Sequence, residues 1–368
     1  MSFVKTNLLL LACGAAGLVF LVIGICGAAS SAVTSDMQQR VGLVTQIGAL
    51  KADPKNEAVI SAARRWHELF QQEYQRTLEQ AHRINRRRPL LPGIFPMPER
   101  PSAGFEFAAA YARAIEEFYR TLVAGGLPGP AEIQDARDYL EHVKEEIPTA
   151  MDVTVDPEHC ACALHARRIR CYAGPESFHV SPLVETNTVP SPEQMWFAQV
   201  GLWIQQDVVN AIARLNGTAA GRVGDGRAHV EHMPVKRIEL LRVLGYQTAR
   251  GLLPFPGGDA GGARSESFTG QTCNDQFDVV RFVLVVVVDQ REMLQLIDQI
   301  SKQNFYQCIG AGYSMVNPDD AQHGYLYGTE PVVRVQLEFE GYMARAVYKP
   351  LMPAKIREAL GADKGDDG

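Results

Sequence analysis

The sequence predicts an α+β protein with an N-terminal transmembrane helix, a long helical or coiled-coil rod, and a ferredoxin-like α+β region present once or duplicated. Three observations predict this class. No charged residue occurs from Thr6 to Ser35, apolar residues recur at heptad-like spacing from Val59 to Ile84, and strand-like and helical segments alternate after Met151.

The first 35 residues are predicted to be an uncleaved membrane anchor. Leu8–Leu11 and Gly17–Ile25 are almost wholly apolar, and a helix needs roughly 20 apolar residues to cross a hydrocarbon core of about 30 Å. A cleaved signal peptide has a shorter apolar core, and a lipoprotein site at Cys13 would have too few apolar residues before it. Lys5 favours a cytoplasmic N-terminus. We therefore expect a single-pass protein of the bacterial inner membrane with a periplasmic body.

Composition excludes some classes of protein. A chain of 368 residues that is 46% hydrophobic can form two or three real cores, and a net charge of -6 argues against a nucleic-acid binder. Two of the seven cysteines, Cys13 and Cys26, lie in the predicted anchor. The odd number of cysteines in the body does not indicate a disulfide framework. One or two disulfide bridges are still possible in an oxidising compartment. The body's cysteines are Cys160, Cys162, Cys171, Cys273 and Cys308.

A helical rod is expected after the anchor, with a helical extension over Asp36–Leu50 and a long helix from Pro54 to Arg88. Its apolar residues follow steps of three and four, which approximates the seam of a coiled coil. An amphipathic helix lying on its own domain is the alternative. For the run Arg86-Arg87-Arg88, a solvated helix end is favoured over a phosphate-binding patch. The predicted pairing residues are Val59, Ala63, Trp66, Phe70, Tyr74, Ala81 and Ile84.

The body is expected to contain a helical hairpin followed by two α+β arcs. The hairpin helices are Ala103–Ala124 and Pro130–Ile147, and strands are expected at Arg168–Ala173 and Phe178–Val184. A helix beginning at Ser191 has a capping box and ends at Asn216-Gly217. The fully apolar run Phe282–Val288 is typical of a buried central strand. The predicted divisions are residues 1–35 (anchor), 36–88 (rod), 89–150 (proline-rich linker and hairpin), 151–250 (first α+β half), 251–276 (flexible linker), 277–352 (second half) and 353–368 (C-terminal helix and acidic tail).

This layout resembles the PilO-type proteins of type IV pilus assembly, the related GspM-type proteins of type II secretion, and their planctomycete-type relatives. The resemblance lies in the apolar run Leu8–Ile25, the seam Val59–Ile84, and the strand Phe282–Val288 with Met293–Ile300 and Val332–Phe339 after it. It implies a non-enzymatic scaffold of an envelope machine that dimerises through its rod and its ferredoxin-like region, as a homodimer or as a heterodimer with a similar protein. The longer body and the added hairpin depart from that family.

No catalytic residue, cofactor, metal, nucleic acid or small-molecule substrate is predicted. The cluster His159-Cys160-Ala161-Cys162, with His165, Cys171 and His179 nearby, offers zinc-type ligands at poor spacing. Residues 257–262 are glycine-rich but lack the lysine of a phosphate loop, and Asp319, Asp320 and His323 lack calcium-loop spacing. Trp196 and Trp203 are assigned to the core, with a partner-binding anchor as the alternative. A membrane-tethered ligand-binding or sensory module is the alternative function.

Overall fold

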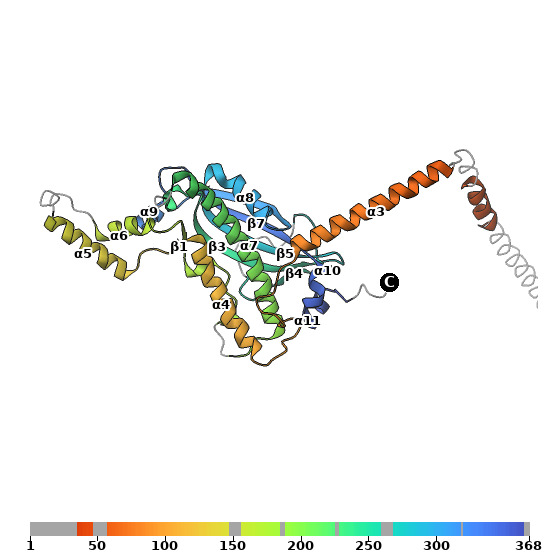
Figure 1. The fold of residues 1–368 in the computed structure, drawn as a ribbon, viewed down its shortest axis with the longest axis horizontal. Helices are drawn as coiled ribbons and strands as arrows, with labels where there is room; N and C mark the ends of the chain where they lie inside the picture. The colour runs from red at the N-terminus through yellow and green to blue at the C-terminus, as the bar shows by residue number, and fades with distance from the viewer. Residues whose placement is uncertain are drawn as a thin grey trace, which may run out of the picture. The chain divides into compact units, whose positions relative to one another are not determined.

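The structure, a computed structural model, describes residues 35–46, 57–146, 156–184, 188–224, 228–258, 268–317 and 319–363 (Figure 1). The chain divides into two compact units, Met1–Thr77 and Leu78–Gly368. The first unit contains a helix over residues 35–46 and most of α3 (Glu57–Asn85). The last residues of α3, from Leu78 onward, belong to the second unit, so this helix is continuous across the division.

A seven-stranded mixed sheet forms the centre of the second unit. Its strand order is β1-β2-β3-β5-β7-β6, and β4 forms a hairpin with β3. The first three strands run parallel, whereas β3, β5, β7 and β6 are antiparallel neighbours. The strands are β1 (Ala124–Gly125), β2 (Cys171–Ala173), β3 (Val235–Thr248), β4 (Gly251–Pro254), β5 (Phe277–Asp289), β6 (Tyr306–Met315) and β7 (Val332–Ala344).

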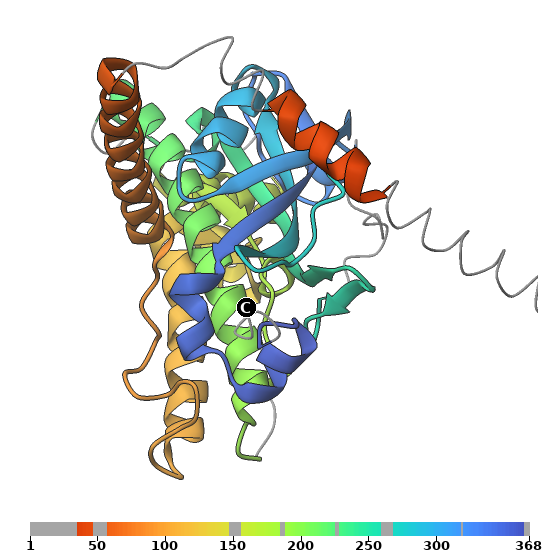
Figure 2. The same ribbon diagram turned by 90° about the vertical axis from the view of Figure 1, so that its right-hand side faces the viewer.

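Helices α4, α7 and α8 cover one face of this sheet, and α4 lies beside α7 in both views (Figures 1 and 2). Their buried side chains share one core with β3, β5 and β7. The helices of this unit, besides the end of α3, are α4 (Ala103–Leu122), α5 (Pro130–Glu146), α6 (Pro157–Ala166), α7 (Pro192–Val223), α8 (Met293–Ser301), α9 (Asp319–Gln322), α10 (Arg345–Tyr348) and α11 (Ala354–Ala359).

Strand β5 is the central strand that its apolar sequence predicts. It pairs with β3 on one side and β7 on the other along nearly its whole length. Residues such as Phe282 and Leu284 point toward the helices, whereas Val283 and Val285 join Leu244 in a smaller cluster on the opposite face. A strand buried on both faces needs no polar alternation, which explains the continuous apolar run.

Helix α7 begins as predicted but continues past its predicted end. Ser191 and Gln194 form the capping box, with Gln194 N donating to Ser191 Oγ at 3.2 Å. The stop predicted at Asn216-Gly217 is wrong, because the helix runs to Val223. The buried Asn216 side chain accepts from Val235 N at 2.9 Å and donates to Val235 O at 3.0 Å. These tertiary bonds hold Asn216 in the helix, so its local tendency to end a helix is overridden.

Two smaller expectations also differ from the structure. The strand expected at Phe178–Val184 is a single β-bridge from Phe178 to Leu241 followed by a 3₁₀ turn, Pro182–Val184. Helix α6, with Asp156 as its N-cap and Pro157 in its first turn, covers residues to which no element was assigned. Its mixed composition gives no clear apolar period, which is the signal on which a helix prediction depends.

The predicted fold class is corrected by the structure. In the ranges that the structure describes, no helix is long and apolar enough to cross a membrane, a finding at odds with the predicted single-pass anchor and inner-membrane localisation. Apart from Ser35, the predicted anchor of residues 1–35 lies outside the described residues. No coiled-coil rod is found there either, because α3 is a single helix. The region predicted to be ferredoxin-like, present once or duplicated, forms one mixed sheet in which β3 pairs with β5.

Burial on both faces makes β5 the part of the sheet most sensitive to loss of side-chain volume. Leu284→Ala removes a side chain that is 0% exposed and is expected to lower the free energy of unfolding by about 2–5 kcal/mol. Leu294→Ala is the matched control on α8, where Leu294 is 72% exposed, and is expected to change it by less than about 0.5 kcal/mol. Urea denaturation at one protein concentration measures both, and equal losses would contradict the central placement of β5.

Candidate functional site

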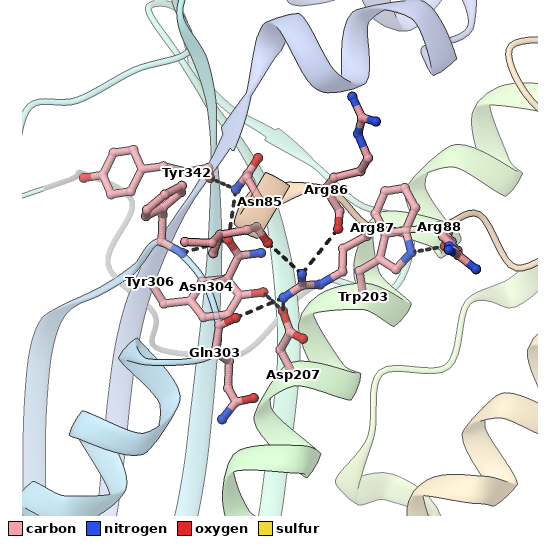
Figure 3. Close-up of polar contacts among 12 residues, drawn as sticks. Asn85, Arg86, Arg87, Arg88, Trp203, Asp207, Gln303, Asn304, Tyr306 and Tyr342 are labelled. Carbon is pink, nitrogen blue, oxygen red and sulfur yellow. Dashed lines mark hydrogen bonds and ion pairs between the residues drawn. The ribbon is translucent and has the colours of Figure 1, made fainter. Parts of the chain in front are cut away.

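The end of α3 is held in the second unit by a partly buried polar cluster, which we call the α3 clamp: Asn85, Arg87, Asp207, Asn304 and Tyr306 (Figure 3). Asn85 is 1% exposed. Its Nδ2 donates to Tyr342 O at 2.8 Å and to Asn304 Oδ1 at 3.0 Å. Its Oδ1 accepts from Ala344 N at 2.7 Å. The last residue of α3 is therefore bonded to β7 and to the turn before β6.

Arg87 carries the charged part of the clamp. Its guanidinium donates to Asp207 Oδ2 at 2.7 Å and to the Gln303 carbonyl at 3.0 Å. It also donates to the Ile84 carbonyl at 2.9 Å, which satisfies one of the carbonyls left open at the end of α3. Tyr306 donates its hydroxyl proton to the same Asp207 oxygen at 2.7 Å. One carboxylate of α7 thus joins the residues after α3 to β6.

Helix α7 supplies a row of polar side chains to this junction. Gln199, Trp203 and Asp207 are spaced four residues apart, so they lie along one side of the helix. Gln199 Oε1 accepts from Leu90 N at 2.7 Å, and Trp203 Nε1 donates to Arg88 O at 2.8 Å. All three are buried in the body. Together they fix the chain from Arg87 to Leu90 along α7 as it leaves α3.

Burial and hydrogen bonding shift the pKa values of the ionisable groups in the clamp. Burial raises the pKa of the Asp207 carboxyl, and the hydrogen bonds from Arg87 and Tyr306 oppose that rise because they stabilise the carboxylate. Burial also raises the pKa of the Tyr306 hydroxyl well above its ordinary value, and the neighbouring Asp207 charge adds to the effect. Tyr306 therefore remains a neutral donor at physiological pH. Each buried polar group here has a partner whose loss would leave it unsatisfied.

The clamp was not predicted from the sequence. Arg86 and Arg88 have exposed side chains, as expected for a solvated helix end, but Arg87 is half-buried and paired. A signal was present on α7, where the polar residues Gln199 and Asp207 share one side of the helix with the apolar Trp203. Polar residues on the buried side of a helix must be hydrogen-bonded, so this row indicates a polar junction.

The seven predicted pairing residues all lie on α3. Trp66, Phe70 and Tyr74 are 67%, 56% and 54% exposed, and the rings of Trp66 and Phe70 stack with centroids 5.5 Å apart. Val59 is 48% exposed and Ala63 is exposed. These five residues lie in the first unit, whereas the half-buried Ala81 and the exposed Ile84 lie in the second. We refer to Trp66, Phe70 and Tyr74 as the α3 stripe.

The cysteine and histidine cluster does not assemble into a metal site. In the described part of the chain, no three His, Cys, Asp or Glu side chains lie close enough together to hold a metal ion. His159, Cys160, Cys162 and His165 lie on α6, and His165 Nδ1 contacts Glu132 Oε1 at 2.9 Å. The five cysteines of the body are all free thiols. Cys171 is fully buried in β2, as a core residue is expected to be.

His179 is a buried structural histidine. It is 4% exposed, and Nε2 lies 2.9 Å from the Pro256 carbonyl. Its backbone N donates to Gln205 Oε1 at 2.7 Å, and its carbonyl accepts from the Tyr111 hydroxyl at 3.1 Å. Burial lowers its pKa to about 4. The imidazole is therefore neutral across the physiological range.

The other candidates have structural roles. Asp320 Oδ2 accepts from Tyr327 at 2.9 Å and from Arg237 at 3.3 Å. Trp196 and Trp203 are 0% and 5% exposed, which confirms their assignment to the core. Of the glycine-rich run, only residues 257 and 258 lie within the described ranges.

A hollow of about 300 Å³ lies between α5 and α6. Its lining includes Glu132, Tyr139, His165 and Arg168. This volume is at the lower limit of small-molecule sites, which are about 300–1,000 Å³. His165 Nδ1 and Glu132 Oε1, 2.9 Å apart, both belong to its lining.

Comparison with known proteins places the chain in no family. No protein-family model matches it, and no curated protein is similar to it. A crystal structure from Akkermansia muciniphila is 10% identical, covers 66% of this chain and 94% of its own, and has a TM-score of 0.28. The core domain of a protein from the same organism is 9% identical, with 62% and 97% covered and a TM-score of 0.23. Neither likeness carries a conclusion, and the resemblance to PilO-type proteins stays a prediction.

The clamp predicts a strong effect of removing one charge. Asp207→Asn leaves Arg87 without its carboxylate and is expected to lower the free energy of unfolding by about 1–3 kcal/mol. Asp298→Asn is the control, because Asp298 pairs with Lys302 on the exposed surface of α8 and is expected to matter by less than about 0.5 kcal/mol. Urea denaturation compares the two, and a loss no larger in Asp207→Asn would show that the pair is not needed.

His179 predicts a pH dependence of stability. The unfolded chain takes up a proton near pH 6.5, whereas folded His179 does so only near pH 4. Between these values the unfolded state binds more protons, so the free energy of unfolding falls as the pH falls, by up to about 3 kcal/mol. His179→Gln is expected to flatten this slope, measured by urea denaturation from pH 7 to pH 4. His142→Gln, which changes a largely exposed histidine of α5, should leave the slope as it is.

Proposed function

We propose that this protein is a non-enzymatic assembly or scaffold protein that binds an apolar helix through the α3 stripe. The observation that carries the proposal is a helix that exposes large aromatic side chains while its last turn is fixed by buried polar bonds. The resemblance to PilO-type proteins supports a place in a pilus- or secretion-type machine.

The chemistry of the stripe supports a helical partner. Trp66, Phe70 and Tyr74 repeat every four residues, so they form one continuous apolar line along α3. Glu68, Gln72 and Glu79 lie on the opposite side, which leaves that side to the solvent. Rows of large exposed apolar side chains mark interaction surfaces, and aromatic residues contribute most of the binding energy at such surfaces. A second copy of α3 is the simplest partner with a matching apolar line.

The clamp supports the same function. A partner bound to a helix affects the rest of a protein only where that helix is firmly attached. Asn85 and Arg87 provide this attachment through bonds to β7, α7 and the turn before β6. None of these groups is left available for chemistry, since each already holds another part of the chain. The cluster therefore suits a mechanical junction better than a catalytic centre.

The test is self-association of the full chain. The double variant Trp66→Ser/Phe70→Ser removes most of the stripe and is expected to weaken association at least tenfold, seen as a fall in average mass by sedimentation equilibrium. Gln72→Ser is the control on the opposite side of α3 and should leave the mass unchanged. The proposal is wrong if the double variant keeps the average mass of the unaltered chain.

A further inference from the structure

Strand β6 forms one edge of the sheet. It pairs with β7 on its inner side, and in the part of the chain that the structure describes no strand pairs with its outer side. Its ten residues, YQCIGAGYSM, contain no charge and no proline. Natural proteins usually protect a long edge strand with charged residues, proline or a covering segment, because its free backbone groups otherwise pair with another strand. This edge is therefore open to pairing.

The two faces of β6 differ in a way that suits a second strand. Tyr313 and Met315 pair with Val335 and Val333 of β7, so they lie on the helix-covered face, yet they are 78% and 87% exposed. On the opposite face, Gly310, Gly312 and Ser314 leave a groove of about 350 Å³ beside Arg334 and Glu338. On one face, a neighbouring strand could bury exposed apolar side chains. On the other face, the side chains are too small to obstruct that strand.

We propose that β6 pairs antiparallel with β6 of a second copy of this chain, about a two-fold axis at Gly312. Antiparallel pairing of identical strands satisfies two-fold symmetry. When one residue of the first copy faces another residue of the second copy, the reverse pair also forms. In this register Tyr313 lies opposite Ala311 of the second copy, so a large side chain meets a small one on both sides of the axis. Gly310 lies opposite Ser314 on the other face. The bulge between Cys308 and Gly310 ends the regular pairing.

The charged residues of β7 beside β6 favour this register. On β7, Arg334 stands beside Ser314 and bonds Glu239 of its own chain at 2.7 Å, and Glu338 stands beside Gly310, 3.3 Å from Arg281 of its own chain. An axis at Gly312 places Arg334 of one copy in the same row as Glu338 of the other, and the reverse pair follows by symmetry. An axis at Ala311 or at Tyr313 places no such opposite charges in one row. The absence of charge within β6 also avoids the repulsion of like charges facing each other across the strands.

A cysteine pair tests the register directly. Directly opposed residues in antiparallel strands have Cα atoms about 4.5–5.5 Å apart, which suits a disulfide. Gly312→Cys is therefore expected to link two chains under mild oxidation, and a Cβ at this position meets no atom within 4 Å. Gly310→Cys is the control, because the two copies of residue 310 would be about 14 Å apart along the strands. The unaltered chain, with its native Cys308, controls for linkage through other thiols.

The second measurement separates this interface from the α3 stripe. In the Trp66→Ser/Phe70→Ser background, the full chain is expected to remain a dimer by sedimentation equilibrium. Adding Tyr313→Asp should raise the dissociation constant at least tenfold, whereas Tyr139→Asp on α5, where Tyr139 is 54% exposed, should not. Three results each overturn the proposal: a monomer before Tyr313→Asp is added, no effect of Tyr313→Asp, or linkage through Gly310→Cys as efficient as through Gly312→Cys. None of them bears on the stripe, which the first double variant tests alone.

Discussion

The fold depends on the burial of one apolar strand, β5, on both of its faces. A run as apolar as Phe282–Val288 of β5 is stable only between two other strands and beneath a layer of helices, and β3, β7 and α7 meet these requirements. The same arrangement determines which strand lies at the edge of the sheet. With β7 needed beside β5, strand β6 becomes outermost in the sheet. The surface that we propose for self-pairing is thus a consequence of how the core is closed.

Helix α7 has a second role that its apolar residues do not explain. It places Gln199, Trp203 and Asp207 along one line, and each bonds to the chain as it leaves α3. Such side chains are costly to bury unless every donor and acceptor is used, and here they are used on backbone groups as well as on Arg87. The core holds the sheet, whereas this polar line holds α3. Trp203 takes part in both, because its ring lies in the core and its indole nitrogen donates to Arg88 O.

Sequence patterns predicted the elements whose signals are local. The periodic apolar residues of α3, α4 and α7 and the continuous run of β5 predicted the correct types, and nearly correct bounds except at the end of α7. The failures concern contacts between distant residues. Asn216 stays helical because of bonds to Val235, and Arg87 is paired with a carboxylate 120 positions away. The choice between a single and a duplicated ferredoxin-like region stayed open, because no local pattern reveals that β3 pairs with β5.

The placement of the three tryptophans has a spectroscopic consequence. Trp196 and Trp203 are buried with ring centroids 6.0 Å apart, and Trp203 donates its indole proton within the body, whereas Trp66 is two-thirds exposed on α3. Indole emission shifts to longer wavelength with exposure to water. The intrinsic fluorescence of this chain therefore contains a blue component from the core and a red component from α3, and iodide in solution would quench mainly the second. Unfolding of the core and binding of a partner to α3 can be followed separately without any added dye.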